Sequence, residues 1–144
     1  MTPEQVFSIV NPLAVVGWIV LILFPRRKWA TDVVIGVAIP ALFAAAYVAI
    51  IVAKWGSSQG SFSSLQGVAT LFANPWLLLA GWIHYLAFDL LTGRWEVMDA
   101  RGRGIPHLVV VPCLLLTFLF GPAGWLLYTV VRFSVSRGER APSL

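Results

Sequence analysis

The sequence predicts an all-α, polytopic integral membrane protein with four transmembrane helices in a single membrane domain, residues 1–144. Three observations lead to this prediction. Apolar residues make up 59% of the chain and charged residues only 11%, whereas soluble proteins carry about 25% charged residues to cover their surface. The mean hydropathy is +0.85. Seven Trp and nine Phe suit a chain that crosses the headgroup level, where aromatic side chains collect.

The first two transmembrane helices are predicted over residues 6–24 and 33–55, because about 20 apolar residues are needed to cross a bilayer. The first ends at the basic run Pro25-Arg26-Arg27-Lys28. It is long enough to cross and has no basic residue before it, so we expect a retained helix and not a cleaved signal peptide. The second contains Pro40, where we expect a kink.

A linker rich in Gly and Ser follows over residues 56–74, a composition that breaks regular structure. Its segment 64–73 is apolar but too short to cross, so we expect an interfacial or re-entrant stretch. The third helix is predicted over 75–92, since Asn74-Pro75 is a typical helix start. Its polar continuation is expected to stay helical until Gly102.

The fourth helix is predicted over residues 106–133. At 1.5 Å per residue it would be about 40 Å long, so we expect one tilted crossing, bent at Pro112 and at the step 121–124.

A weak internal repeat is visible in the chain. Asn11-Pro12 leads to a Gly-Trp-Ile triplet, and Asn74-Pro75 leads to another one residue later. Two duplicated helical hairpins of the same orientation would explain it, although chance similarity between apolar helices is the alternative. Such hairpins place loops 25–32 and 92–106, with six basic residues, on one side, which the positive-inside rule makes cytoplasmic.

The distribution of charge bears on the partners of the protein. The basic tail residues Arg132, Arg137 and Arg140 would lie opposite the basic loops after a fourth crossing, which conflicts with the positive-inside rule. The net charge of +4 does not indicate nucleic-acid binding, because the basic residues lie between apolar stretches and not on one polar face. We expect the lipid bilayer as the main partner. Small residues such as Ala44-Ala45-Ala46 permit close helix contact, within one chain or in a homo-oligomer.

Ionisable groups in spanning helices are costly and are therefore candidates for function. Five of the eight Asp, Glu and His residues fall within residues 84–107, and they are the candidate catalytic residues: His84, Asp89, Glu96, Asp99 and His107. On a helix Asp89 and Glu96 share one face, whereas His84 points about 140° away from Asp89. The pattern predicts a polar pocket at the basic end of the third and fourth helices.

Each of these residues also has a structural alternative. Asp89 could pair with Arg94, and Asp99 with Arg103 at i, i+4. Glu96 could neutralise another arginine of the same boundary, and the histidines could bond to the backbone. If the site held a metal, the same five residues would be its ligands, as in 2-His-1-carboxylate sites. Their spacing matches no compact ligand motif, so no metal or other cofactor is expected. The only cysteine, Cys113, is expected to be an inert apolar residue.

The run NPWLLLAGWIHYLAFDLLTGRWEVMDARGRGIPHLVVVPCLLLTFLFGPAGWLLY, residues 74–128, resembles the abscisic-acid-deficient/neoxanthin-synthase-like family of small membrane proteins. The run FSIVNPLAVVGWIVLILFPRRK, residues 7–28, extends the resemblance. The family acts in carotenoid metabolism, and its plant members are required to form neoxanthin in plastids. No plastid transit peptide is evident in this compact chain, so we expect a bacterial member in the cytoplasmic (inner) membrane, acting on another carotenoid or isoprenoid.

The resemblance implies a cofactor-independent isomerase that opens an epoxide and removes a neighbouring proton, which requires an acid and a base. A carboxyl group at a lipid boundary tends to stay protonated, so Asp89 or Glu96 suits the acid, and His84, His107 or another carboxylate the base. The hydrophobic substrate is expected to contact aromatic residues: Trp18, Trp76, Trp82, Tyr85 and Phe88. Two alternatives stay open, a non-catalytic carotenoid-binding or accessory protein and a small proton-coupled transporter.

Overall fold

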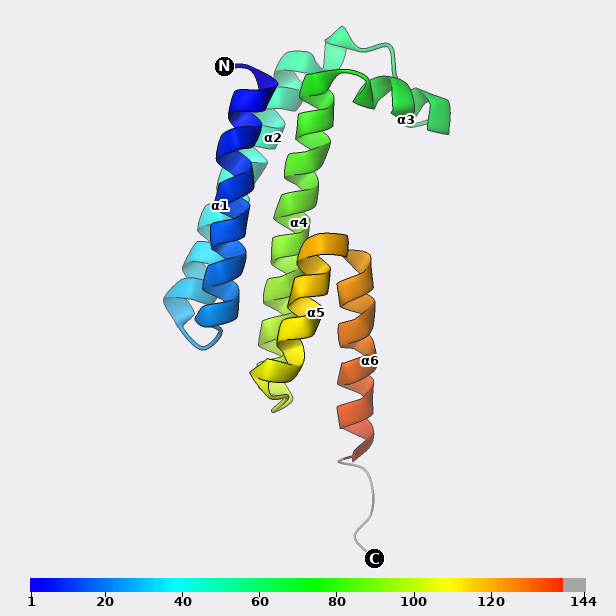
Figure 1. Cartoon of the computed structure of the whole chain (residues 1–144). Helices are drawn as coiled ribbons and strands as arrows, with labels where there is room; N and C mark the ends of the chain where they lie inside the picture. The colour runs from blue at the N-terminus through cyan, green and yellow to red at the C-terminus, as the bar shows by residue number, and fades with distance from the viewer. Residues whose placement is uncertain (139–144) are drawn as a thin grey trace, which may run out of the picture.

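The computed structural model describes residues 1–138 and is helical throughout, with no strand in that range. The elements are α1 (Pro3–Leu23), the π-helix η1 (Trp29–Ala38), α2 (Ile39–Lys54), the short 3-10 helix η2 (Trp55–Ser57), α3 (Leu65–Phe72), α4 (Pro75–Gly102), α5 (His107–Phe120) and α6 (Pro122–Gly138). Figure 1 shows long, roughly parallel rods with α3 lying across one end. The predicted all-α class is confirmed.

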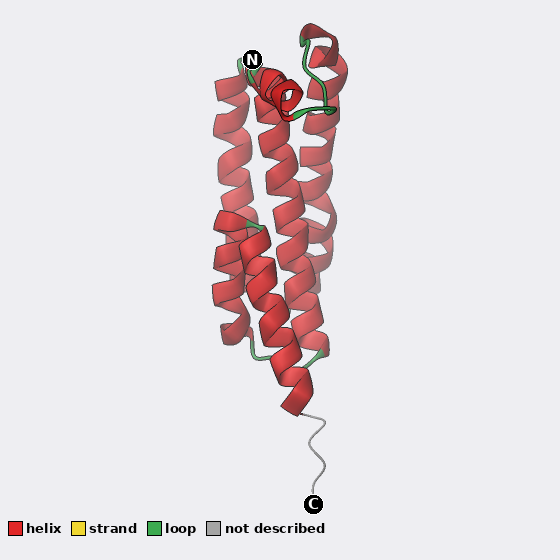
Figure 2. Cartoon of the chain, turned by 90° about the vertical axis from the view of Figure 1, so that its right-hand side faces the viewer, coloured by secondary structure: helices red, strands yellow, loops and turns green. Residues whose placement is uncertain are grey.

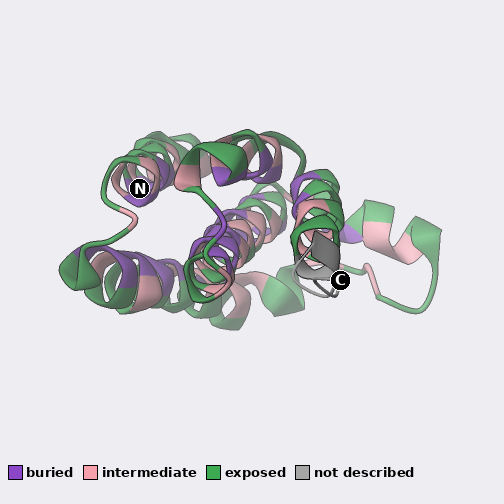
Figure 3. Ribbon diagram, turned by 90° about the horizontal axis from the view of Figure 1, so that it is seen from below, coloured by how far each residue is buried: buried purple, intermediate pink, exposed green. Residues whose placement is uncertain are grey.

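Three helical stretches in the described residues are long and apolar enough to cross a membrane: Pro3–Leu23, Trp29–Ser57 and Pro75–Gly102. The protein is therefore an integral membrane protein. The inward faces of the helices carry the buried residues, and the outer faces are exposed (Figure 3). Because many of these exposed side chains are large and apolar, lipid and not water suits the outer surface.

The second crossing begins earlier than predicted and contains a change of helix type. It starts at Trp29 as a π-helix, and the Ile39 N–H still donates to the Val34 carbonyl, five residues back. Pro40 follows at the start of α2. Proline has no N–H to donate. The hydrogen bonding therefore changes from the π-helical to the α-helical pattern at a position where the backbone lacks one donor.

The linker contains a short helix, α3, within the predicted segment 64–73, and its placement at the membrane interface stays a prediction. Helix α3 begins after Ser64, whose side chain accepts from the Gly67 N–H at 3.0 Å. It lies across the end of the bundle where the chain begins (Figure 1). Asn74 then caps α4 by accepting from the Trp76 N–H at 3.0 Å, with Pro75 in the first turn, which confirms the predicted helix start.

Helix α4 is the central element and contacts each of the other α-helices. It is unbroken from Pro75 to Gly102, so the polar continuation is helical as predicted. Its 28 residues reach about 42 Å, more than the hydrocarbon core. Gly93 allows α1 to approach closely, because a Cβ there would lie 2.6 Å from the ring of Trp18.

The prediction of one continuous helix over residues 106–133 is wrong. Helix α5 ends at Phe120, Gly121 has φ +42°, and α6 begins at Pro122. Glycine tolerates this backbone conformation, and the chain turns back so that α5 and α6 form an antiparallel hairpin (Figures 1 and 2). The 14 residues of α5 cover about 21 Å, too short to cross a core of about 30 Å.

The hairpin changes the predicted topology of the C-terminal part. Loops 24–28 and 103–106 lie at one end of the bundle, and α6 returns to this end (Figure 1). Arg132 therefore joins the basic loops, which removes its conflict with the positive-inside rule. The side chain of Arg137 and all of Arg140 lie outside the described part of the chain. The two Asn-Pro pairs differ, since Pro12 lies inside α1 whereas Pro75 starts α4, so duplication stays a prediction.

Candidate functional site

Two carboxyl groups on α4, the fully buried Glu96 and the half-buried Asp89, face the α5–α6 hairpin. Glu96 is completely buried, and its Oε1 accepts from the hydroxyl of Thr117 on α5 at 2.9 Å. Its other oxygen, Oε2, is buried and has no hydrogen-bond partner among the described residues. Buried polar atoms are nearly always satisfied, so an exception in a membrane-embedded helix marks a candidate functional site.

The second carboxyl group, Asp89, lies against the turn of the hairpin. A Cβ on Gly121 would be only 2.9 Å from Asp89 Oδ1, so the missing side chain of this glycine lets the carboxyl group approach the turn. Asp89 Oδ2 is buried and has no partner among the described residues. Two N–H groups of the turn are used within it: Gly121 donates to the Thr117 carbonyl at 2.8 Å, and Gly124 donates to the Gly121 carbonyl at 3.1 Å.

Asp99, the third predicted carboxylate, belongs to a structural network. Its Oδ2 lies 2.8 Å from Arg103 Nε and 3.0 Å from Arg132 Nε, and it accepts from the Tyr128 hydroxyl at 2.7 Å. The pairing with Arg103 agrees with the structural alternative at i, i+4. Arg132 and Tyr128 come from α6, and sequence reasoning did not foresee them. This network ties α6 to α4, and Asp99, unlike Asp89 and Glu96, has partners for its buried oxygen.

The structure brings neither histidine to the carboxyl groups. His84 stacks on Phe88 with a centroid distance of 4.6 Å and lines a 270 Å³ cavity beneath α3. The Nε2 of His107 donates to the Ile22 carbonyl of α1 at 2.9 Å. The single pocket predicted for all five residues is therefore not formed. In the described part of the chain no three His, Cys, Asp or Glu side chains lie close enough to hold a metal ion.

The predicted substrate-contacting aromatic residues have different surroundings. Trp18 is buried in the core, 5.5 Å from the ring of Phe118, so it does not line an open surface. The Trp82 Nε1 donates to Asn11 Oδ1 of α1 at 3.2 Å. Trp76 lies under the ammonium group of Lys54 at 5.4 Å.

Phe88 and Tyr85 lie closer to the candidate site. The Tyr85 hydroxyl donates to the Phe118 carbonyl of α5 at 3.4 Å, one helical turn from Asp89 on the same face of α4. Phe88 lines a second cavity of 290 Å³, with Trp95 of α4 and Trp125 of α6. Trp95 and Trp125 were not among the predicted residues.

The two cavities are separate, the upper between α2, α3 and α4 and the lower between α4 and α6, but both lie on the same face of α4; we call this face with its two cavities the α4 groove. The α4 residues that line it include Leu77, Gly81 and His84 in the upper cavity and Phe88, Leu91 and Trp95 in the lower one. These positions repeat every three or four residues, the spacing of one helical face. The stretch 77–95 rises about 27 Å, close to the thickness of the hydrocarbon core. Asp89 points about 100° away from Phe88, so its carboxyl group lies beside the groove.

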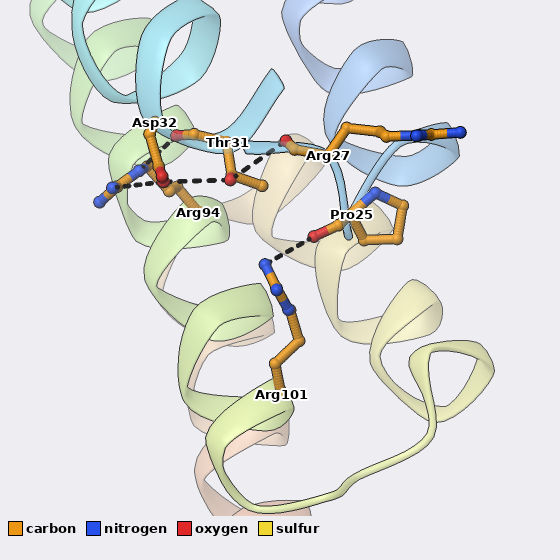
Figure 4. Close-up of polar contacts among 6 residues, drawn as sticks. All are labelled: Pro25, Arg27, Thr31, Asp32, Arg94 and Arg101. Atoms are coloured by element: carbon orange, nitrogen blue, oxygen red, sulfur yellow. Dashed lines mark hydrogen bonds and ion pairs between the residues drawn. The ribbon is translucent and has the colours of Figure 1, made fainter. Parts of the chain in front are cut away.

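Two arginines of α4 hold the connection between α1 and η1 (Figure 4). Arg94 Nε donates to the Thr31 carbonyl at 2.6 Å, and its Nη2 lies 3.4 Å from Asp32 Oδ1. Seven residues later, Arg101 Nη1 donates to the Pro25 carbonyl at 3.3 Å. The alternative pairing of Asp89 with Arg94 is therefore wrong. Asp32 lies outside the cluster 84–107, so spacing along the chain gave no signal for this ion pair.

The fold and the site define a polytopic α-helical membrane protein with one buried and one half-buried carboxyl group on its central helix. The chain belongs to the ABA4-like family, described as ABA DEFICIENT 4-like, whose family model matches residues 5–128. This confirms the family resemblance of the sequence and makes the protein a membrane protein related to carotenoids and abscisic acid. No curated protein and no solved structure gives a significant match to the chain.

Proposed function

We propose that this protein is an isomerase that opens the epoxide of a carotenoid or related isoprenoid by acid–base catalysis. The observation that carries the proposal is the pair of buried carboxyl oxygens, Asp89 Oδ2 and Glu96 Oε2, without hydrogen-bond partners among the described residues. They belong to residues two helical turns apart, about 10 Å along the axis of α4. An acid and a base on either side of a reacting group are what this isomerisation requires.

The positions of the two carboxyl groups favour different roles. Asp89 lies beside the α4 groove and is partly exposed, so we assign it as the acid at the epoxide oxygen. Glu96 is held by the Thr117 hydroxyl at one oxygen, and we assign its free oxygen as the base. His107 bonds to the Ile22 carbonyl and His84 stacks on Phe88. Of the predicted bases, the second carboxylate is therefore the one that faces the hairpin beside Asp89. Because Glu96 is fully buried, the reaction requires the α5–α6 hairpin to shift away from α4.

The proposed reaction balances without a redox cofactor. The proton of the acid passes to the epoxide oxygen as the carbon–oxygen bond breaks. The electrons of a neighbouring carbon–hydrogen bond form the new double bond, and the released proton passes to the base. Substrate and product have the same composition, so the reaction is an isomerisation.

The α4 groove supports access of an elongated apolar substrate from the bilayer. Its two cavities together cover a stretch of α4 about as long as the hydrocarbon core is thick, and the lower one is lined by aromatic rings of α4 and α6. Its lower cavity of 290 Å³ suits one ring of a substrate, since whole ligands usually occupy about 300–1,000 Å³.

The test is product analysis in a host that makes an epoxidised carotenoid such as violaxanthin, with and without the protein. We expect a product of unchanged mass with wild type, and a loss of about 10²–10⁴-fold in its formation with Asp89→Asn or Glu96→Gln. Glu4→Gln is the matched control, because its carboxyl group is exposed and lies outside the site. Equal product formation by site variants and the control would refute the assigned roles.

The groove also favours a second candidate, a membrane protein that binds a carotenoid without converting it. In that case pigment would copurify with wild type and with Asp89→Asn, unchanged in both. Replacing Phe88 with Ala would then reduce the bound pigment, whereas replacing Phe7, an exposed residue outside the groove, would not.

A further inference from the structure

A second cavity with a different character lies at the basic end of the bundle. It has a volume of 450 Å³ and lies between the end of α1, the lower part of α4 and the start of α5. Two contacts hold its walls together: Arg101 Nη1 to the Pro25 carbonyl at 3.3 Å, and His107 Nε2 to the Ile22 carbonyl at 2.9 Å. We call it the basic cavity, and it is separate from the carboxyl pair and from the α4 groove.

The basic cavity carries positive charge that no acidic side chain neutralises. Arg26 and Arg101 line it. The acidic groups at this end are engaged elsewhere, Asp32 with Arg94 and Asp99 with Arg103 and Arg132. In the described part of the chain neither Arg26 nor Arg101 has an ion pair. Two arginines in the lining of one cavity favour an anionic ligand, and the guanidinium group suits phosphate oxygens in particular.

The start of α5 adds to this preference. Pro106 is its N-cap and lines the basic cavity, and no side chain caps the helix there. The N-terminus of a helix carries a partial positive charge and free N–H groups that attract anions. The positive end of α5 and the two arginines therefore line the same cavity, and each of them favours an anion there.

The apolar walls of the cavity indicate an amphiphile and not a small soluble anion. Val97, Ile105 and Val110 share the lining with the arginines. Leu23 and Leu108, which follow Ile22 and His107 in sequence, are 64% and 84% exposed, so acyl chains have apolar surface beside the cavity. Phe24 and Trp29 form an exposed aromatic pair at 5.5 Å, as is common at the headgroup level.

We propose that the basic cavity binds the phosphate headgroup of an anionic phospholipid, with Arg26 and Arg101 pairing with the phosphate oxygens. Basic pockets between transmembrane helices are suited to such headgroups. The bound lipid would join the α1–η1 connection to the α4–α5 connection, the two loops that meet at this cavity. The proposal is independent of the reaction assigned to Asp89 and Glu96.

The test uses the full chain in detergent micelles with three probes: phosphatidylglycerol, phosphatidylcholine with the same acyl chains, and inorganic phosphate. Native mass spectrometry measures lipid retention, and the melting temperature gives a second readout. We expect phosphatidylglycerol to be retained and to raise the melting temperature more than phosphatidylcholine. Inorganic phosphate alone is expected not to compete, because it leaves the apolar walls unfilled.

Matched variants separate the cavity from general surface charge. Arg26→Gln should weaken retention of phosphatidylglycerol about tenfold, as expected for the loss of one charge-assisted hydrogen bond. Arg26 and Arg27 are both exposed, but only Arg26 lines the cavity. Arg27→Gln removes the same charge from the neighbouring position and should leave retention within about twofold of wild type. Both variants leave the Arg101–Pro25 contact intact, and unchanged melting without lipid checks that both fold.

Three results would overturn the proposal. If Arg26→Gln and Arg27→Gln weaken phosphatidylglycerol retention equally, the lipid binds through general surface charge and not in the cavity. Equal retention of the two phospholipids would remove the role of the anionic headgroup. Competition by inorganic phosphate at the same concentration would point to a soluble anion.

Discussion

Gly124 should control whether the α5–α6 hairpin can close. A Cβ at this position would overlap the backbone N, Cα and side-chain Oγ1 of Thr117 on α5. Backbone atoms cannot move aside as a flexible side chain can, so we take the upper end of the usual overpacking cost, about 3 kcal/mol. Alanine regains about 1 kcal/mol of helix propensity. Gly124→Ala should therefore destabilise the protein by about 2 kcal/mol, a fall in melting temperature of about 6 °C at this chain length.

The only cysteine provides a local assay for this prediction. Cys113 is buried on α5, so its reaction rate with a thiol-specific dye in detergent reports on exposure of the hairpin. Gly124→Ala should both lower the melting temperature and speed labelling. Gly102→Ala is the matched control, because a Cβ there meets no atom within 4 Å. If the two variants melt and label alike, the close approach of α5 and α6 does not limit stability, and the reasoning fails.

Three further substitutions test contacts between helices, each by thermal melting in detergent. Arg94→Met should cost about 1.5–3 kcal/mol, because it removes charged hydrogen bonds to η1, whereas Arg27→Met, at an exposed position, should melt as wild type does. Tyr128→Phe should cost about 1–2 kcal/mol, since its hydroxyl donates to Asp99; wild-type melting would mean that the bond contributes nothing. Gly121→Ala should cost about 1–3 kcal/mol, because φ is +42°, and unchanged melting together with unchanged cysteine labelling would show that the turn tolerates a side chain.

Hydropathy and capping residues were sufficient to predict most of the fold. The apolar runs located α1, α2 and α4, and Asn74-Pro75 marked the start of α4. The hairpin was missed because an apolar run of this length suits one tilted helix or two short ones equally well. Its Gly-Pro step was interpreted as a bend. What decides the outcome is contact with α4, where Asp99 binds Tyr128 and Arg132, and such contacts leave no local pattern in a sequence.

Helical periodicity predicted part of the candidate site. It placed Asp89 and Glu96 on one face and His84 on another, which agrees with the structure. It gave no information on which helices would cover each face. Periodicity therefore predicts His107 beside the carboxyl groups, whereas in the structure its ring donates to the Ile22 carbonyl of α1. Thr117, the partner of Glu96, is an uncharged residue in an apolar run and carried no recognisable signal.

The hairpin also decides where the two ends of the described chain emerge. The first turn of α1 and the last turn of α6 lie at opposite ends of the bundle (Figure 1). With three candidate spans in a bilayer and a hairpin too short to add a fourth, a factor that docks on one of these two turns would lie on the other side of the membrane from a factor that docks on the other turn.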